Sequence, residues 1–289
     1  MALTFDDVPF MKPLGFWRPR EVSNMILRTL KKEGIHAAGF VVQEKVEDDL
    51  STYIVLDDWV SQGQILGNQT WGDADLNVLS HEYFLEHATD GQKYLKRLAR
   101  AHPFNFRYLR FPQLHEGNTK EKKKKVRQAL ERGDYKIAPV TVKTWDYLFN
   151  RPYIENETRP ERVQTLKKMY LELIGQSLDY SESQSKKVFG KNISHILQLH
   201  TGIATATFLP DLIQMLRNRG YQFISFPEAL SDPAFKTEEQ YVGPLGLTFI
   251  DRVAATRGMD FDENCGLELK ELEKRLKQLD RSSRRTPGS

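Results

Sequence analysis

Side chains able to carry out acid–base or metal chemistry follow several short apolar runs of the sequence. In chain order they are Asp6 and Asp7, Gln69 and Asp73, Arg110, Asp146 and His200. If the apolar runs are parallel strands, their carboxyl ends meet at one rim, where such folds hold their sites. Paired acids, an arginine and a histidine at one rim are typical of general acid–base or metal-assisted hydrolysis.

The elements that must position these side chains alternate between strand and helix. Apolar residues at helical spacing, followed by Gly34, predict a helix over residues 21–33. The short apolar runs predict buried strands. The predicted strands cover residues 1–5, 37–42, 65–67, 106–111, 137–142, 194–200 and 222–226, and the other predicted helices cover 56–62, 76–101 with a break at Gly91, 120–132, 161–178 and 209–219. This order predicts an α/β fold with parallel strands inside and helices outside, either open or closed into a barrel.

The composition is that of a globular protein. Of the 289 residues, 39% are hydrophobic and 28% are charged, which excludes disorder of the bulk of the chain. The net charge of +3 is too small to indicate nucleic-acid binding. A single cysteine, Cys265, excludes an internal disulfide and a thiolate metal cluster. No apolar run is long enough for a membrane span, and the first residues lack the pattern of a signal peptide, so neither is expected in this chain.

The last part of the chain departs from the alternating pattern. After a turn at residues 243–246, helices are predicted near 248–257 and 267–279. The predicted organisation has three parts, listed in chain order: a barrel over 1–235, a helical extension packed on it over 236–280, and a disordered tail over 281–289.

Five segments of the sequence resemble, in the right order, the motifs of the polysaccharide deacetylases of carbohydrate esterase family 4. They are Thr-Phe-Asp-Asp at 4–7, Gly-Asn-Gln-Thr-Trp-Gly-Asp at 67–73, Leu-Arg-Phe-Pro at 109–112, Thr-Trp-Asp-Tyr at 144–147 and Leu-Gln-Leu-His at 197–200. The resemblance covers residues 1–235. It implies an α/β fold in the form of a deformed (β/α) barrel of about seven parallel strands with outer helices.

The resemblance also implies a role for each matching residue. Asp6 would be the catalytic base and His200 the general acid. Asp7 would be a metal ligand, and Arg110 would brace the base. Asp146 would be a partner of His200 or Arg110. Contacts with substrate are expected from the backbone N–H of Gln113, from sugar stacking on Trp71 and Trp145, and from Leu199.

The expected metal site departs from the family pattern. Where the family has two histidines in its second motif, this sequence has Gln69 and Asp73. With Asp7 they form an all-oxygen set, which favours Mg²⁺, Mn²⁺ or Ca²⁺ over the zinc usual in the family, or no metal at all. His115, just past the third motif, is a candidate replacement ligand. The fourth motif is altered too, with Lys143 in place of its leading Asp.

Three functions are compatible with this pattern. The leading hypothesis is a hydrolase that removes N-acetyl groups from amino-sugar polymers such as peptidoglycan or chitin, using a divalent metal. The rival hypothesis is an inactive, carbohydrate-binding member of the family, which the altered metal site favours. A third is deacylation of a small metabolite or a nucleoside-like amide. The resemblance implies an N-acetylated polysaccharide as partner, without nucleic acid, and a periplasmic, cell-envelope or secreted location; the oligomeric state is left open.

Overall fold

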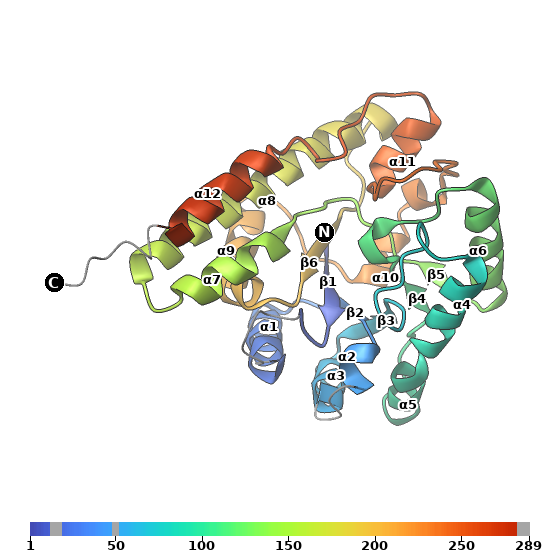
Figure 1. The fold of residues 1–289 in the computed structure, drawn as a ribbon, viewed down its shortest axis with the longest axis horizontal. Coiled ribbons are helices and arrows are strands. Elements are labelled where there is room, and N and C mark those ends of the chain that lie inside the picture. Colours follow the sequence, from blue (N-terminus) through green and yellow to red (C-terminus); the bar gives the residue numbers. More distant parts are fainter. Residues whose placement is uncertain (12–18, 48–51, 282–289) are drawn as a thin grey trace.

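The computed structural model describes residues 1–11, 19–47 and 52–281, and a sheet of six parallel strands lies at its centre. The strands are β1 (Ala2–Val8), β2 (Ala38–Val41), β3 (Ile65–Asn68), β4 (Tyr108–Leu109), β5 (Lys136–Ile137) and β6 (Ile196–His200). Their order across the sheet is β5-β4-β3-β2-β1-β6. Figure 1 shows the strands in the middle of the molecule with the helices around them.

The helices turn apolar stripes toward the interior. In α1 (Pro19–Glu33), Val22, Ile26 and Leu30 are buried at helical spacing, and lysines occupy the last turn. The other helices are α2 (Glu44–Glu47), α3 (Tyr53–Ser61), α4 (His81–Asp90), α5 (Lys93–Ala101), α6 (Lys120–Arg132), α7 (Asn150–Asn156), α8 (Pro160–Phe189), α9 (Ile203–Asn218), α10 (Phe226–Leu230), α11 (Phe249–Thr256) and α12 (Leu269–Arg281). Short 3₁₀ helices are η2 (Pro112–Leu114), η3 (Asp146–Phe149) and η4 (Pro233–Lys236).

Residues 136–142 connect the two edges of the sheet. At their start, β5 pairs with β4, and at their end Val142 forms a parallel bridge with Leu197 of β6. The strand predicted over 137–142 is therefore divided between two partners, and Pro139, which has no N–H to donate, lies between them. The predicted barrel of parallel strands with outer helices is confirmed. The described part of the chain has six strands where about seven were expected.

The segment 222–226 is not the strand that its apolar pattern predicts. From Thr4 on, β1 is paired on both sides, with β2 and with β6, so this segment can reach only the start of the strand. It forms two hydrogen bonds there: Ile224 N–H donates to the Met1 carbonyl at 3.0 Å, and the Met1 ammonium group donates to the Gln222 carbonyl at 2.6 Å. The Ser225 side chain then accepts a hydrogen bond from Glu228 N–H and begins α10 instead.

Other predicted elements differ from the structure mainly in length. The helix expected over 76–101 begins only at His81, and it breaks at Gly91 as expected. The strand expected over 106–111 is reduced to β4. Helices α8 and α9 are longer than predicted, and Pro210 lies inside α9.

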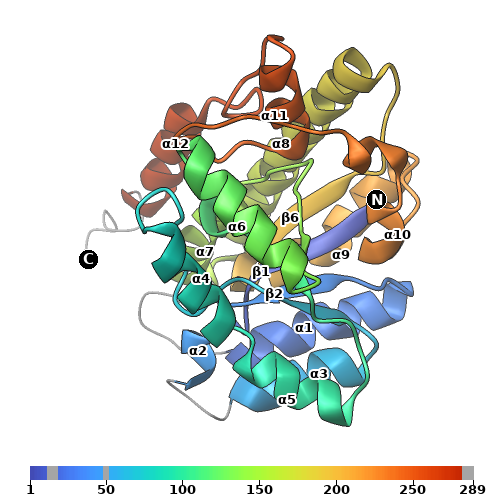
Figure 2. The same cartoon turned by 90° about the vertical axis from the view of Figure 1, so that its right-hand side faces the viewer.

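The C-terminal helices pack on the helices of the barrel. Figure 2 shows α11 and α12 alongside α8, and α12 also contacts α7. Ile250 of α11 is buried with Val188 of α8, while Leu272 and Leu276 of α12 join the main hydrophobic core. The predicted tail, from residue 282 onward, lies outside the described residues. Within the described ranges, no helix is both long and apolar enough to cross a membrane.

Candidate active site

A cavity of about 290 Å³ opens where β1, β3 and β6 end. Of the residues predicted from the sequence, its walls include Asp6, Asp7, Gln69, Asp73, Gln113, Trp145 and His200. The other wall residues are Leu114, His115, Lys143, Tyr147, Gln198 and Gly246. Two larger cavities, of about 390 and 400 Å³, lie elsewhere, and neither is lined by a histidine. The smaller cavity is the candidate site because, of these three, it combines several acids with a histidine.

Asp6 is almost completely buried at the base of the cavity, with 2% of its surface exposed. Its Oδ2 accepts a hydrogen bond from Gln198 Nε2 at 2.6 Å, and its Oδ1 lies 3.7 Å from Arg110 Nε. Oδ1 is buried without a hydrogen-bond partner among the described residues. Burial raises the pKa of the Asp6 carboxyl, and the charges of Arg110 and His200 oppose that rise. One oxygen of a fixed carboxyl group is therefore left to take a proton.

Arg110 lies behind Asp6 and is completely buried. Its Nη2 donates to Thr4 Oγ1 at 3.1 Å, and its guanidinium lies 4.5 Å from the centre of the Phe40 ring. Burial lowers the pKa of Arg110, whereas the neighbouring Asp6 carboxylate raises it. Because the nearest approach to Asp6 is 3.7 Å, the arginine supports that carboxylate by charge and not by a direct hydrogen bond.

His200 is fixed by Asp146. His200 Nδ1 lies 2.6 Å from Asp146 Oδ1, and the other carboxylate oxygen accepts hydrogen bonds from His200 N–H at 2.9 Å and from Thr205 Oγ1 at 2.7 Å. Burial by itself lowers the pKa of His200, but the charge and hydrogen bond of Asp146 together with the charges of Asp7 and Asp6 outweigh burial and raise this pKa to about 9. The imidazole is therefore protonated at neutral pH, and Nε2 is the ring nitrogen left to act on a ligand.

Replacing Asp146 by asparagine is expected to lower the pKa of His200 from about 9 to below about 8, because the neutral amide no longer stabilises the imidazolium. The measurement is an NMR titration of the histidine ring resonances. Asp75→Asn is the matched control, since Asp75 pairs with a different histidine of the same cavity, His115, at 2.9 Å. An unchanged His200 pKa in the Asp146→Asn protein would contradict the role given to this carboxylate.

The residues that match the family's metal ligands do not form a metal site. Lys45 Nζ lies 2.8 Å from Asp7 Oδ1, so an ammonium group already neutralises this carboxylate. The side-chain oxygen of Gln69 accepts a hydrogen bond from Asp7 N–H at 2.9 Å. Among the described residues, no group of three or more acid, histidine or cysteine side chains could hold a metal ion. The donors present therefore do not fit a divalent ion.

Asp73 is a weak candidate for cation binding as well. Asp73 keeps solvent-exposed surface, and it also lines the cavity. Burial and the charge of Asp7 raise the pKa of its carboxyl group to about 6, and the charge of Lys45 opposes that rise. This carboxyl is therefore partly protonated in mildly acidic solution. His115, the candidate replacement ligand, pairs through Nδ1 with Asp75 at 2.9 Å.

The expected substrate contacts divide into two groups. Gln113 and Trp145 line the cavity, and both have a left-handed backbone, with φ of 55° and 50°. Trp71 is not among the lining residues, and Leu199 is 0% exposed within the hydrophobic core. Leu199 therefore has no side-chain surface to offer a ligand. Its neighbours in the strand, Gln198 and His200, face the cavity instead.

Gly246 and Lys143 complete the wall beside Gln113. A Cβ at position 246 would lie 1.9 Å from the Gln113 carbonyl oxygen, so only glycine allows this close approach. Lys143 Nζ donates to the Gly246 carbonyl at 3.1 Å and lies 4.5 Å from the centre of the Trp145 ring. Burial lowers the pKa of Lys143. The lysine that replaces the family's acid thus holds the C-terminal extension against the cavity.

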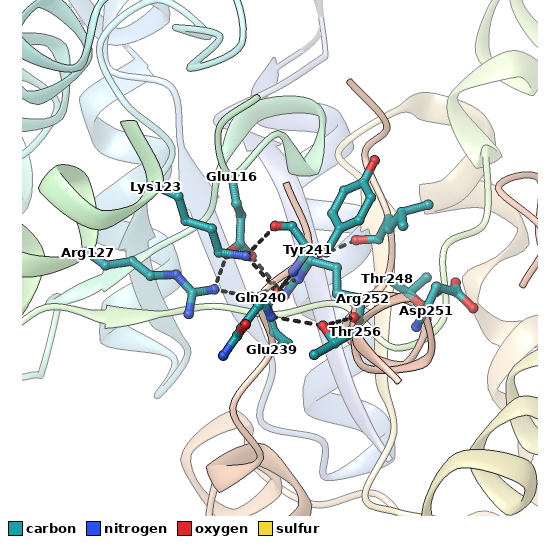
Figure 3. Close-up of polar contacts among 11 residues, drawn as sticks. Glu116, Lys123, Arg127, Glu239, Gln240, Tyr241, Thr248, Asp251, Arg252 and Thr256 are labelled. Carbon is teal, nitrogen blue, oxygen red and sulfur yellow. Dashed lines mark hydrogen bonds and ion pairs between the residues drawn. The ribbon is translucent and has the colours of Figure 1, made fainter. Parts of the chain in front are cut away.

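A buried charge network behind this wall joins the loop after η2 to the extension (Figure 3). Lys123 Nζ lies 2.6 Å from Glu239 Oε2, and Arg252 Nη2 lies 2.8 Å from Glu116 Oε1. Arg127 pairs with Glu116 at 2.6 Å and also with Glu239. Three cations share two acids, so each acid is held from several sides. The network fixes the chain that follows η2 and therefore one wall of the cavity.

Sequence reasoning missed, in different ways, Gln198, which lines the cavity, and Lys45, which pairs with the lining residue Asp7. Gln198 stands two residues before His200 on β6, and strand alternation places both on the same face, so this signal was available. Lys45 lies in the one-turn helix α2, and nothing in its spacing indicates that it reaches Asp7.

The comparisons with known proteins agree with this fold. Residues 1–137 match the family model described as polysaccharide deacetylase. The resemblance predicted from the motifs is thus confirmed over these residues. A search among curated proteins found no match.

Solved structures with this fold include active and inactive members of the family. A chitin deacetylase from Colletotrichum lindemuthianum is 21% identical, with 80% of this chain and 87% of that chain covered and a TM-score of 0.55. A peptidoglycan N-acetylglucosamine deacetylase is 17% identical, with coverage of 79% and 86% and a TM-score of 0.52. A family 4 pseudoenzyme from Bacillus anthracis is 19% identical, with coverage of 80% and 64% and a TM-score of 0.53. The chain therefore spans just under two thirds of the pseudoenzyme's length, and these likenesses establish the fold.

Proposed function

We propose that the cavity is an amide-hydrolysis site that removes N-acetyl groups from an amino-sugar polymer. The observation that carries this proposal is the pairing of two opposite proton-transfer groups at one cavity. Asp6 has a buried carboxylate oxygen without a hydrogen-bond partner among the described residues, and His200 is an imidazolium fixed by Asp146. A base and an acid with separate supports are what amide hydrolysis requires.

The reaction needs one proton taken and one proton given. Asp6 would accept a proton from the water that attacks the acetyl carbonyl carbon. His200 would give its proton to the amide nitrogen as the carbon–nitrogen bond breaks, which yields acetate and a free amine. Arg110 would keep the Asp6 carboxylate ionised between turnovers, and Asp146 would hold the imidazole in position.

The protonation states support this assignment. The pKa of Asp6 is raised by burial, which makes its carboxylate a stronger base than an exposed aspartate. The pKa of His200 is raised to about 9, so the acid carries its proton at neutral pH. A carboxyl group with a raised pKa therefore lies at the same cavity as an imidazole that is protonated at neutral pH.

The substrate class is proposed from the named functions of solved structures that share this fold. Two solved structures with this fold are named as a chitin deacetylase and a peptidoglycan N-acetylglucosamine deacetylase. Both names point to polymers that carry N-acetylglucosamine. An enzyme acting on such a polymer would meet it in the periplasm, the cell envelope or outside the cell, so we extend the proposal to that location.

A second candidate function is binding of the same polymer without turnover. The Lys45–Asp7 ion pair favours it, because the ligand set of the family is altered there. A pseudoenzyme of the family has the same fold, and a mutant of it is described as having restored enzymatic activity. Proteins with and without activity therefore share this fold, and turnover distinguishes the two candidate functions.

Acetate release from N-acetylglucosamine oligomers and from peptidoglycan tests the proposed function. We expect the wild-type protein to release acetate and to leave one free amine for each acetate formed. Calorimetric titration with the same oligomers is the companion measurement. Oligomer binding without acetate release would contradict hydrolysis and establish the second candidate. The absence of both would remove the substrate class from the proposal.

A further inference from the structure

We infer that the ammonium group of Lys45 takes the place of a divalent cation in this cavity, so that the protein binds no metal there while Lys45 is present. The inference concerns the same cavity as the proposed function and deepens it. It rests on the contacts of Lys45, Asp7 and Gln69 and is tested by counting bound metal, so either proposal can fail without the other.

Lys45 is held in place by the backbone around it. Its side chain is 10% exposed and points to Asp7, with the ammonium nitrogen 2.8 Å from Oδ1. The neighbouring Glu44 N–H donates to the Trp71 carbonyl at 2.8 Å, and the Gln43 side chain accepts from a backbone N–H of α5 at 2.9 Å. Helix α2 is therefore attached to the loop that carries the second motif, and the ammonium is fixed beside the first motif.

Two of the oxygen atoms that a metal would need already accept hydrogen bonds. One oxygen of Asp7 accepts from Lys45, and the side-chain oxygen of Gln69 accepts from Asp7 N–H at 2.9 Å. Asp7 has a left-handed backbone, with φ of 66°, and the Gln69 contact satisfies its N–H in this conformation. Gln69 is thus a support for the backbone of Asp7, and not a residual half of a metal site.

The charge of Lys45 also serves the second acid of the cavity. Asp73 interacts electrostatically with Asp7, which repels it, and with Lys45, which attracts it. One ammonium group therefore lies within reach of both acids that remain from the family's ligand set. A divalent ion placed on Asp7 would meet the repulsion of this fixed positive charge and would have to displace it.

The experiment measures zinc binding by titration calorimetry and by metal content after dialysis. It compares the wild type with two triple variants, Lys45→Met/Gln69→His/Asp73→His and Lys45→Arg/Gln69→His/Asp73→His. Both variants receive the two imidazoles of the family pattern. They differ in whether position 45 keeps its positive charge, so the arginine variant is the matched control.

We expect no stoichiometric zinc in the wild type, and no change of its melting temperature with zinc or with chelator. We expect the methionine triple variant to bind one zinc ion, and to do so roughly 100-fold more tightly than the arginine triple variant, the scale on which a neighbouring group changes metal affinity. Adding Asp7→Asn to the methionine variant should abolish this binding.

Two results would overturn the inference. The first is one tightly bound zinc ion in the wild type that is lost with Asp7→Asn. The second is equal zinc affinity in the methionine and arginine triple variants. Thermal unfolding of each protein shows whether the triple variants fold. The wild-type measurement needs no substitution at position 45, so it can refute the inference even if a triple variant does not fold.

Discussion

Replacing Asp6 by asparagine is expected to lower kcat for acetate release by about 10³-fold, since a positioned general base contributes about 10²- to 10⁴-fold. Asparagine has nearly the same shape as aspartate, and its side-chain oxygen can still accept the hydrogen bond from Gln198 beside Arg110. It cannot accept a proton from the attacking water. The loss should therefore appear in kcat, with a small change in KM, because the base acts on water and not on the bound sugar.

Two controls separate a lost base from a damaged fold. Asp179→Asn changes an exposed acid of α8 that pairs with Arg219, and it should leave kcat unchanged. Calorimetric binding of N-acetylglucosamine oligomers to the Asp6→Asn protein should remain close to that of the wild type. If the Asp6→Asn protein keeps its turnover, Asp6 is not the base, and the catalytic assignment of the cavity is wrong.

Replacing Glu239 by glutamine is expected to lower the free energy of unfolding by about 3 kcal/mol, because it leaves the buried Lys123 and Arg252 and the half-buried Arg127 to share Glu116 alone. The side chain of Glu239 is 3% exposed, so water cannot take over the lost charge. The measurement is urea unfolding at neutral pH. Glu121→Gln is the matched control. Glu121 pairs with Lys125 on the surface of α6, the helix that also carries Lys123 and Arg127, and the loss of this exposed pair should change the stability little.

The effect of Glu239 should also depend on pH. Burial alone would raise its pKa, but Arg252, Arg127 and Lys123 outweigh burial and hold the pKa of Glu239 below its usual 4.5. Its stabilisation is therefore fully present above pH 4.5 and is lost as the pH falls through the lower, folded-state pKa. The wild type should lose more stability than Glu239→Gln in that acidic range. Equal losses in the two proteins would contradict the network as an important source of stability.

The catalytic pair could be predicted from the sequence because strand ends determine where its members lie. Asp6 and His200 are paired neighbours in the register of β1 and β6, so two motifs far apart in the chain had to meet. Arg110 follows β4 directly, and its burial behind Asp6 follows from that position. In a parallel barrel, once the strands are known, the residues at their carboxyl ends, which form the rim of the site, are known as well.

The same logic would have excluded one predicted contact. Leu199 lies between Gln198 and His200 on β6, and side chains alternate along a strand. Two residues that face the cavity therefore place the one between them in the core. The substrate contact assigned to Leu199 came from the family motif, and strand geometry overrides it.

What could not be predicted depends on contacts between elements with no periodic signal. Lys45 reaches Asp7 from a one-turn helix, and its position follows from backbone bonds to the second-motif loop. The segment 222–226 has the apolar pattern of a strand, yet β1 is paired on both sides from Thr4 on and leaves it contacts only with Met1. Pattern alone does not say which edges of a sheet are already occupied.

Hydrolysis of an N-acetyl group by Asp6 and His200, without a metal ion, can be tested by acetate release from N-acetylglucosamine oligomers, measured once with a strong chelator and once with added zinc. We expect the wild type to show the same rate in both conditions, and Asp6→Asn to be about 10³-fold slower. A wild-type protein that releases acetate with zinc but not with chelator would show that hydrolysis here requires a metal ion.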